Sequence, residues 1–442
     1  YWHLMGIEGG NDLVSPMDLF AFGPGNPDAA IAHIKTGPYP WFIDTEFKAH
    51  FFRPFSCLLM TLDDTLFGHF APAYHLHTLF WHFLLALGAM FILRRAFPPG
   101  IGVLALILFV VDEAHAFPVS WWSNRNAVVA VAFGFLGVTA HLRWREDGWR
   151  AGLPLSLLGY VFALLSAEIG LCTLAYVPAY EWFAAPGTFR KRMYSMAPAT
   201  AVAVAYFLFY RAGGYGAAYS DIYVDPGADP LGYLAVAPLR FAELMGAQFF
   251  GLPCEMALLR AGIEPVFILL GAIGLALVGL ALWKVWPRLD DTEKRALRWL
   301  IPGAVLSTTP SLAAIVSART LLAASLGGAA VIATIIVHVR RAVAESTAWQ
   351  PARWLRALAI LFIAIHLVVA PLSWPLQTLA IRSIATRLNG ILRHAEVDES
   401  TIAYQQIILV NAADPFTGMY MRTLRTFDGK PSPRAARTLP IA

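Results

Sequence analysis

Acidic side chains crowd the beginning of this chain, and their types suit proton transfer beside a phosphate. Between residues 8 and 53 the polar residues that could do chemistry are Glu8, Asn11, Asp12, Asp18, Asp28, Asp44, Glu46, His50 and Arg53. A carboxylate can take a proton from an attacking hydroxyl, and an arginine can hold a phosphate through two parallel hydrogen bonds. Any single acid in this stretch also fits a plain solvated position, so residue type alone does not select the base.

A second set of polar residues stands at the edges of long apolar stretches. It comprises Asp112, Glu113, His115, Arg125, Glu168 and Arg319. Ionisable groups at the edge of hydrocarbon are costly and often functional, so Glu168 and Arg319 fit a substrate contact as well as a structural ion pair. The spacing of Asp112, Glu113 and His115 is not one of the strong zinc patterns. The sequence therefore predicts no metal site and leaves open whether a metal is needed.

These residues belong to a chain that is too apolar to face water on all sides. Hydrophobic residues make up 58% of it and charged residues 14%, whereas a soluble domain is nearer half apolar and a quarter charged. The basic residues form short clusters between apolar runs instead of one soluble face, which argues against a nucleic-acid partner. The composition predicts an α-helical polytopic membrane protein, with membrane lipid as its surroundings.

Ten apolar stretches come close to the 20 or so residues that a helix needs to cross a membrane. They are residues 71–93, 101–117, 124–142, 153–168, 170–185, 194–211, 265–286, 299–316, 320–339 and 355–376. Pro98, Pro99 and Gly100 separate the first two, as turn residues do. The stretches 153–168 and 170–185 are short and share one apolar run.

About half of the 33 basic residues lie in alternate connections between these stretches. The clusters are Arg94 and Arg95; Arg143, Arg145 and Arg150; Arg190, Lys191 and Arg192; Lys284, Arg288, Lys294, Arg295 and Arg298; and Arg340, Arg341, Arg353 and Arg356. The positive-inside rule predicts that they face the cytoplasm. Residues 1–70, 212–264 and 377–442 then lie on the periplasmic side of a bacterial inner membrane.

The stretch 231–250 is apolar enough to cross the membrane, but crossing would turn the basic cluster at 284–298 outward. We therefore predict a helix that lies in the outer interface. Arg240 and Glu243 are expected on its water-facing side.

Three domains follow from this scheme: a first periplasmic loop at 1–70, a transmembrane domain at 71–376, and the start of a small C-terminal periplasmic α/β domain at 377–442. The signals in the last are a helical apolar stripe of Ile384, Leu388, Ile391 and Leu392, a buried strand from Ile407 to Val410, and a helix that starts at Asp414 and Pro415 and stops at Gly429. The chain begins at Tyr1 without a methionine. We expect a further spanning helix before Tyr1 and more soluble chain after Ala442.

Neither the cysteines nor the clustered histidines predict a metal centre. Cys57, Cys172 and Cys254 are far apart and lack zinc spacing, so packing is favoured. A Cys57–Cys254 disulfide is also allowed, because both residues fall on the same predicted side. The three histidines between residues 75 and 82 fit packed, hydrogen-bonded positions better than metal ligands.

Sequence motifs around the polar residues resemble those of a membrane glycosyltransferase family. They are His50, Phe51, Phe52, Arg53 and Pro54; Leu62 and Asp63; Leu66, Phe67 and Gly68; Tyr74, His75, Leu76 and His77; Trp81 and His82; Ala114, His115 and Ala116; Pro118, Val119, Ser120, Trp121 and Arg125; and Leu165, Ser166, Ala167 and Glu168. In order and spacing they are similar to the protein O-mannosyltransferase-like glycosyltransferases of the GT-C class, over about residues 1–185. Beyond them the resemblance rests on helix number and an outer C-terminal domain.

Members of that family take a sugar from a polyprenyl-phosphate carrier and pass it to an acceptor hydroxyl outside the cytoplasm. The resemblance implies a GT-C-like fold, a lipid-linked sugar as donor, no covalently bound cofactor, and a protein or glycan as acceptor. It also implies that Asp12 is the catalytic base. Arg53, His115, Arg125 and Glu168 match motif positions near the donor phosphate or the base, and Arg319 joins them by its place at the edge of an apolar stretch.

Several positions depart from the family pattern. Asn11 replaces the first residue of an acidic pair, Asp112 and Glu113 replace His-Pro, Phe117 replaces an acid, and Ala167 replaces a lysine. A second hypothesis therefore stays open, namely a catalytically inactive GT-C-like subunit of a membrane assembly with partner subunits. A third, a transporter or lipid-binding protein, lacks a pair of Gly/Pro-broken helices in corresponding halves.

Overall fold

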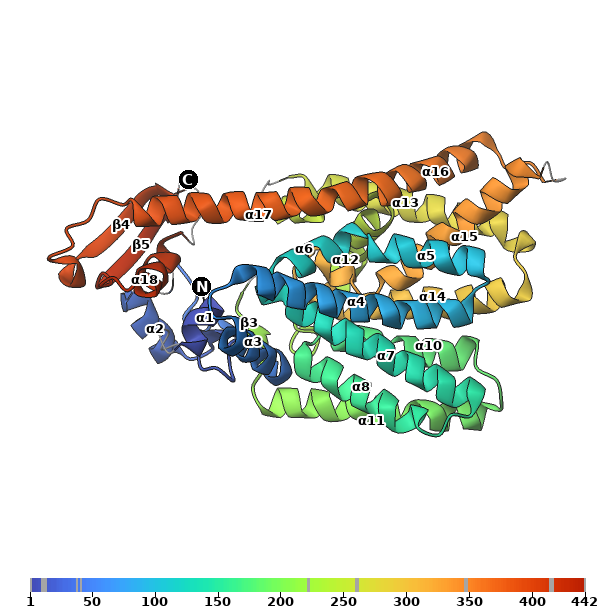
Figure 1. Ribbon diagram of the computed structural model, residues 1–442, viewed down its shortest axis with the longest axis horizontal. Helices are drawn as coiled ribbons and strands as arrows, with labels where there is room; N and C mark the ends of the chain where they lie inside the picture. The colour runs from blue at the N-terminus through green and yellow to red at the C-terminus, as the bar shows by residue number, and fades with distance from the viewer. Residues whose placement is uncertain are drawn as a thin grey trace. The chain divides into compact units, whose positions relative to one another are not determined.

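The apolar stretches fold as helices in the computed structural model (Figure 1), which describes residues 2–8, 14–36, 39, 42–220, 223–258, 262–345, 349–412 and 417–440. The chain divides into two compact units. We call Ala71–Phe209 with Val224–Gln377 the helical unit, and Tyr1–Phe70, Tyr210–Tyr223 and Thr378–Ala442 the mixed unit. The assignment of each unit to a side of the membrane stays a prediction.

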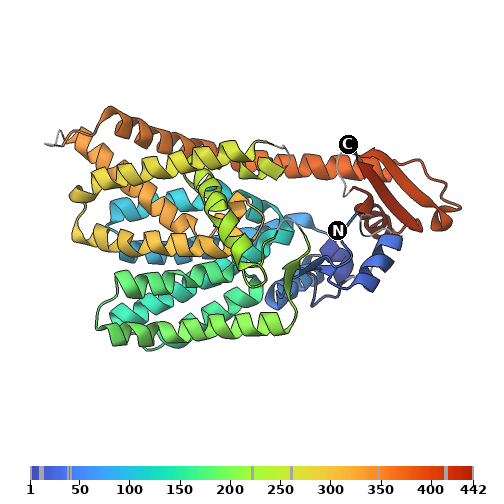
Figure 2. The same cartoon turned by 180° about the vertical axis from the view of Figure 1, so that it is seen from behind.

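Helices of the helical unit run side by side for most of its length (Figures 1 and 2). Its first half contains α4 (Ala71–Ala96), α5 (Pro99–Val110), α6 (Glu113–Ser120), η1 (Trp122–Asn124), α7 (Arg125–Asp147), α8 (Gly152–Ser166), α9 (Gly170–Leu174), α10 (Tyr176–Phe183) and α11 (Phe189–Ala212). Its second half contains α12 (Pro230–Phe250), η2 (Cys254–Leu258), α13 (Glu264–Val285), η3 (Trp286–Arg288), α14 (Asp291–Thr308), η4 (Thr309–Ala313), η5 (Ala318–Leu321), α15 (Ser325–Ala344), α16 (Arg353–Ala364), the π-turn η6 (Ile365–Val369) and the start of α17 (Ala370–Arg393).

Glycines bring α7 into backbone contact with the helices around it. A Cβ on Gly159 of α8 would lie 2.8 Å from Cα of Gly137 on α7, and one on Gly88 of α4 would lie 2.9 Å from Cβ of Phe135. Small residues at such crossings let helices approach closely, which is how helices pack when no hydrophobic force separates protein from lipid. α7 is accordingly the most buried of the long apolar helices in the described part of the chain.

Apolar side chains cover the outer faces of the peripheral helices. Phe207 and Leu208 of α11 are 54% and 61% exposed, and Leu269 and Ile273 of α13 are 60% and 48% exposed. Large apolar surfaces of this kind need an apolar solvent. The chain is a multi-pass membrane protein.

The predicted number of ten membrane spans is not confirmed. Among the described residues six helices are long and apolar enough, and a seventh is counted if α5 and α6, bent by 45°, form one span. All ten stretches contain helix, but α8 is only 15 residues long, α9 and α10 are shorter still, and α14 begins in a charged turn. The apolar run at 153–185 is therefore divided into short pieces.

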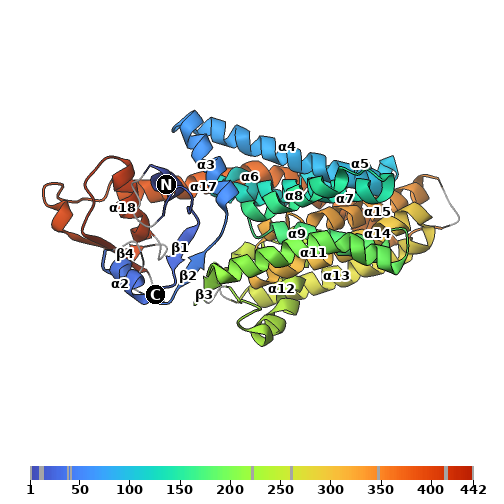
Figure 3. The same cartoon turned by 90° about the horizontal axis from the view of Figure 1, so that it is seen from below.

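The predicted helix at 231–250 forms as α12, but its polar face differs from the prediction. α12 crosses the direction of its neighbours in Figure 2 and lies at the edge of the bundle in Figure 3. Glu243 is 1% exposed, so its predicted place on a water-facing side is wrong. The reason is close packing on α13, where a Cβ on Gly271 would lie 1.9 Å from the carbonyl oxygen of Ala242.

The five basic clusters gather at one end of the helical unit. The ends of α4, α7 and α10 meet the start of α14 around Arg95, Glu146 and Arg295, and Arg341 at the end of α15 lies 3.5 Å from a Cβ built on Gly100. Arg192 donates to the carbonyl of Trp182 at the end of α10. Alternating helix directions account for this grouping, and which end faces the cytoplasm stays a prediction.

The mixed unit combines short helices with two small sheets in its described part. Its helices are α1 (Trp2–Ile7), α2 (Pro27–Thr36), α3 (Pro54–Phe67), the rest of α17, η7 (Ile402–Tyr404) and α18 (Thr417–Phe427). Strands β1 (Ala21–Pro24), β2 (Lys48–His50) and β3 (Gly216–Ala218) pair antiparallel in that order. Strands β4 (Gln406–Ala412) and β5 (Ala435–Pro440) pair parallel around α18.

Several C-terminal signals of the sequence match elements of the structure. The strand predicted at 407–410 lies within β4, but its predicted burial is wrong, because Ile408 and Val410 are 54% and 67% exposed. Gly429 takes a left-handed φ of 68° just after α18. Leu392 packs in a core with Met421 and Leu424. Ile384 and Ile391 instead stay exposed, so only half of the predicted stripe is buried. Asp414 and Pro415 fall outside the described residues.

All three cysteines are buried and free, so Cys57 and Cys254 form no disulfide. The packing interpretation of these residues fits their burial. Cys57 lies on α3, Cys172 on α9 and Cys254 at the start of η2.

We expect Gly159→Ala to separate α7 from α8, because the new methyl group would meet the Gly137 backbone closer than real Cβ contacts allow. Overpacking of this kind typically costs about 1–3 kcal/mol. Thermal melting of the purified protein in detergent measures the loss. The matched control is Gly279→Ala on α13, whose Cβ would meet nothing within 4 Å. Equal melting temperatures for the two variants would contradict the close crossing.

Candidate active site

A break between two helices organises the polar residues of the helical unit. α5 ends at Val110 and α6 begins at Glu113 after a 45° bend. Asp112 is the N-cap of α6, and its Oδ1 accepts a hydrogen bond of 2.9 Å from the backbone N–H of Ala114. Gln248 of α12 donates to the other carboxylate oxygen over 3.4 Å. Both carboxylate oxygens of Asp112 therefore accept hydrogen bonds that hold α6 and α12 at the break between α5 and α6.

Glu113, the next residue, faces the end of α12. A Cβ on Gly251 would lie 3.4 Å from its Oε2, and Glu113 lies within electrostatic range of Glu255. Glu255 in η2 accepts hydrogen bonds of 2.7 Å from both the hydroxyl of Ser317 and the backbone N–H of Ala318. These bonds fasten η2 to the start of η5, so the two carboxylates share one neighbourhood.

Arg319 follows directly in η5 and reaches back to α6. Its guanidinium lies 5.5 Å from the ring centroid of Phe117 and 6.0 Å from that of Trp121, within the range of cation–π attraction. A partly buried cation over two aromatic rings, in the element that Glu255 fastens through Ala318, is an arrangement that can hold a phosphate and a sugar ring. We call Glu113, Glu255, Arg319, Phe117 and Trp121 the break cluster.

His115 lies in the core of the helical unit and is not exposed. It is fully buried, and its Nε2 lies 3.1 Å from the hydroxyl of Ser325. Its ring packs edge-on against Phe109 and His82, with centroids 4.5 Å and 5.6 Å away. A role at the donor phosphate stays a prediction for this residue.

Arg125 begins α7 and is only 2% exposed. Its Nη1 lies 3.2 Å from Nδ1 of His77, whose Nε2 accepts a hydrogen bond of 2.9 Å from the indole of Trp81. His77 thus has the hydrogen bonds that the sequence predicts, whereas His75 is exposed and its predicted packed position is wrong. Glu168 lies in the turn between α8 and α9 and is partly buried.

Element packing brings some of the predicted residues near one another. α6, which carries His115, contacts η5, which carries Arg319, and α7, which begins at Arg125. Glu168 precedes α9, which also packs on α7. Arg53 belongs to the mixed unit, at the start of α3, with its guanidinium 4.7 Å from the centroids of both Phe20 and Phe51.

The predicted base, Asp12, and its neighbour Asn11 lie outside the described residues. Among the described acids of the first loop, Asp18 pairs with His50, whose Nε2 lies 2.9 Å from each carboxylate oxygen. The ring of Tyr215 packs edge-on against His50 at 4.8 Å. An aspartate–histidine pair can accept a proton, and β2 positions this one.

One group of side chains in the described part of the chain could hold a cation. The ligand atoms of Glu8, Asp64 and His69 lie within 4.8 Å of one another. Asp112, Glu113 and His115 do not form such a group, because Asp112 caps a helix and His115 is in the core.

Sequence reasoning missed two parts of this picture. Glu255 is not among the predicted site residues. An acid soon after the helix-ending Gly251 and Pro253 is nevertheless a signal that could have indicated it. The pairing of Asp18 with His50 joins residues 32 positions apart, and only the register of β1 on β2 brings them together.

Comparison with known proteins finds a remote structural likeness. No protein-family model matches the chain, and no curated protein matches it. A solved structure of an oligosaccharyltransferase from Archaeoglobus fulgidus, tethered to an acceptor peptide, aligns with a TM-score of 0.42 and 14% sequence identity. The alignment covers 98% of this chain and 64% of that chain.

The raised pKa of Glu243 makes the stability of the folded protein depend on pH. Burial, together with the charges of Glu264 and Glu255, raises the pKa of Glu243 to about 7 from an ordinary 4.5. Within the described residues its Oε1 has no hydrogen-bond partner. The folded protein therefore binds more protons here than the unfolded chain between these two values, so stability falls as pH rises through this range.

We expect the Glu243→Gln variant not to lose stability as the pH rises. The wild type should lose stability between about pH 5 and about pH 8, and the variant should exceed it by about 1–3 kcal/mol at the upper end. Thermal melting against pH measures the difference. Exposed Glu345 supplies the control Glu345→Gln, which should follow the wild type. Parallel curves for Glu243→Gln and wild type would rule out a buried acid of raised pKa.

Proposed function

We propose that this protein is a membrane glycosyltransferase that moves a sugar from a polyprenyl-phosphate carrier to an acceptor hydroxyl. The break cluster is the observation that carries the proposal, because it joins an arginine, two carboxylates and two aromatic rings beside one helix break. Arginine suits a phosphate, and aromatic rings suit the apolar faces of a sugar or a prenyl chain. The motif resemblance across residues 1–185 points to the same chemistry.

The proposed reaction is a single inverting displacement. Asp12 accepts the proton of the acceptor hydroxyl while that oxygen attacks the anomeric carbon of the sugar. The bond between this carbon and the phosphate oxygen breaks, and its electron pair leaves with the polyprenyl phosphate. Arg319 stabilises the phosphate as negative charge develops on it, with Arg125 in a supporting role. Asp18 with His50 is the next candidate for the base.

A second candidate is a GT-C-like subunit that no longer catalyses. It is favoured by the roles of two motif residues, since Asp112 caps α6 and His115 is fully buried. Release of polyprenyl phosphate from a lipid-linked sugar by the purified protein separates the two. The subunit hypothesis predicts none, whatever the variant.

Asp12→Asn should lower turnover by about 10²–10⁴-fold, the usual contribution of a general base. The melting temperature should change little, because asparagine has nearly the size and shape of aspartate. The matched control is Asp28→Asn, an exposed acid of the same segment, which should retain full activity. Asn11→Asp, which restores the acidic pair, should leave turnover unchanged or raise it. Full turnover from Asp12→Asn would remove Asp12 as the base and direct the test to Asp18.

Substitutions of Arg319 test the phosphate contact in the same assay. Arg319→Gln removes a charged hydrogen-bond donor and should lower kcat/KM by about 10–100-fold. Arg319→Lys keeps the charge but loses the planar fork, so we expect an intermediate loss. Unchanged kcat/KM in both variants would limit Arg319 to packing on Phe117 and Trp121.

A further inference from the structure

A cavity of about 210 Å³ opens at the basic end of the helical unit, apart from the break cluster. The ends of α4, α7 and α10 and the first turn of α14 form its walls. The polar and aromatic residues that line it are Arg95, Glu146, Tyr180, Asp291, Arg295 and Trp299. At roughly 30 Å³ per water molecule, the cavity has room for a small polar group.

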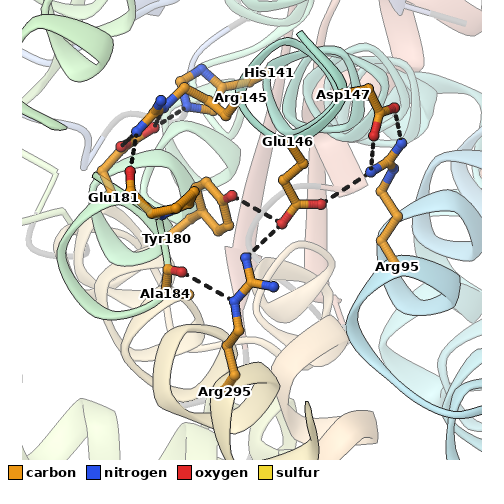
Figure 4. Close-up of polar contacts among 10 residues, drawn as sticks. Arg95, His141, Arg145, Glu146, Asp147, Tyr180, Glu181, Ala184 and Arg295 are labelled. Carbon is orange, nitrogen blue, oxygen red and sulfur yellow. Dashed lines mark hydrogen bonds and ion pairs between the residues drawn. The ribbon is translucent and has the colours of Figure 1, made fainter. Parts of the chain in front are cut away.

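Ionic contacts fix the walls of this cavity (Figure 4). Glu146 accepts hydrogen bonds from Arg95 at 3.0 Å, from Arg295 at 2.7 Å and from the hydroxyl of Tyr180 at 3.0 Å. Glu181, beside Tyr180, accepts two hydrogen bonds of 2.6 and 2.9 Å from Arg145. Tyr180 and the helix ends around it are thus held before any ligand binds.

Two charged residues of α14 remain available at the cavity. Arg295 donates through Nε to Ala184 and through one Nη to Glu146, and its second Nη has no partner in the described part of the chain. The carboxylate of Asp291 likewise makes no hydrogen bond or ion pair among the described residues. Positions 291 and 295 share one face of a helix, so a cationic donor and an anionic acceptor stand side by side.

The signs of charge around the cavity are balanced. Arg95 is paired with Glu146 and Asp147, which leaves the cationic Arg295 and the anionic Asp291 to face a ligand. A plain anion would meet two carboxylates and a plain cation two guanidinium groups. A zwitterion, with a phosphate at Arg295 and an ammonium at Asp291, satisfies both signs. An ammonium group also donates hydrogen bonds to carboxylates, which a quaternary amine cannot do.

Exposed aromatic residues place this end of the unit at the level of lipid head groups. Trp182 and Phe183 at the end of α10 are 55% and 52% exposed, and Trp283 near the end of α13 is 65% exposed with the ammonium of Lys284 over its ring. Aromatic rings and basic residues concentrate at membrane interfaces. Two of the long apolar helices, α4 and α7, end at the cavity.

We propose that this cavity binds the phosphoethanolamine head group of a membrane lipid. The lipid phosphate lies at the second Nη of Arg295, and the ammonium group lies at the carboxylate of Asp291. The acyl chains follow the apolar outer faces of the helices. The site is independent of glycosyl transfer, because none of its residues belongs to the break cluster.

Native mass spectrometry of the delipidated full chain in detergent tests this site. The probes are phosphatidylethanolamine, phosphatidylcholine and phosphatidylglycerol with identical chains, and soluble phosphoethanolamine. We expect phosphatidylethanolamine to bind about tenfold more tightly than either other lipid. Phosphatidylglycerol has no cation for Asp291, and the quaternary amine of phosphatidylcholine cannot donate a hydrogen bond to it. Soluble phosphoethanolamine that bound as tightly as the lipid would assign the cavity to a soluble ligand and overturn the lipid source.

Two variants test the phosphate contact and the ammonium contact of the site separately. Arg295→Gln should weaken phosphatidylethanolamine about tenfold, and Asp291→Asn should remove its advantage over phosphatidylglycerol. Arg298→Gln is the control, an exposed arginine of the same helix that does not line the cavity, and it should bind like the wild type. Thermal melting confirms that the variants are folded. Equal affinity for the three lipids, or no effect of either variant, would overturn the proposal.

Discussion

A helix that breaks inside an apolar bundle exposes backbone groups that lipid cannot satisfy, and the break between α5 and α6 meets this constraint with Asp112. Its side chain caps α6, Gln248 holds its other oxygen, and Trp374 donates to its backbone carbonyl over 3.2 Å. Because all three contacts converge on one residue, the direction of α6 is fixed. The positions of Phe117 and Trp121, and so of the surface that Arg319 covers, depend on that direction.

Asp112 and Glu113 both have side chains that suit the start of a helix. Aspartate is among the best N-caps, and a glutamate in the first turn of a helix complements its dipole. The two residues therefore stabilise the start of α6, and Glu113 places a carboxylate at the candidate site.

Charged side chains are arranged differently at the basic end of the helical unit and at the break cluster. At the basic end, Arg145, Glu181 and His141 form a buried group, and Glu146 links Arg95 with Arg295. At the break cluster the charges are fewer and Arg319 stacks on aromatic rings. Closed ionic networks fix helix ends, whereas the guanidinium of Arg319 lies over two aromatic rings. This contrast separates the proposed lipid site from the proposed catalytic site.

The sequence by itself determined the membrane class and the position of every long apolar helix, because hydrophobic run length and basic clusters act locally along the chain. It also located the strand within β4. Tertiary structure alone decided that His115 belongs to the core, that Glu243 is buried by close packing of α12 on α13, and that Asp18 meets His50. It likewise divided the run at 153–185 into short helices. Those outcomes depend on which faces pack together, and the order of residues in one chain does not encode that packing in any local pattern.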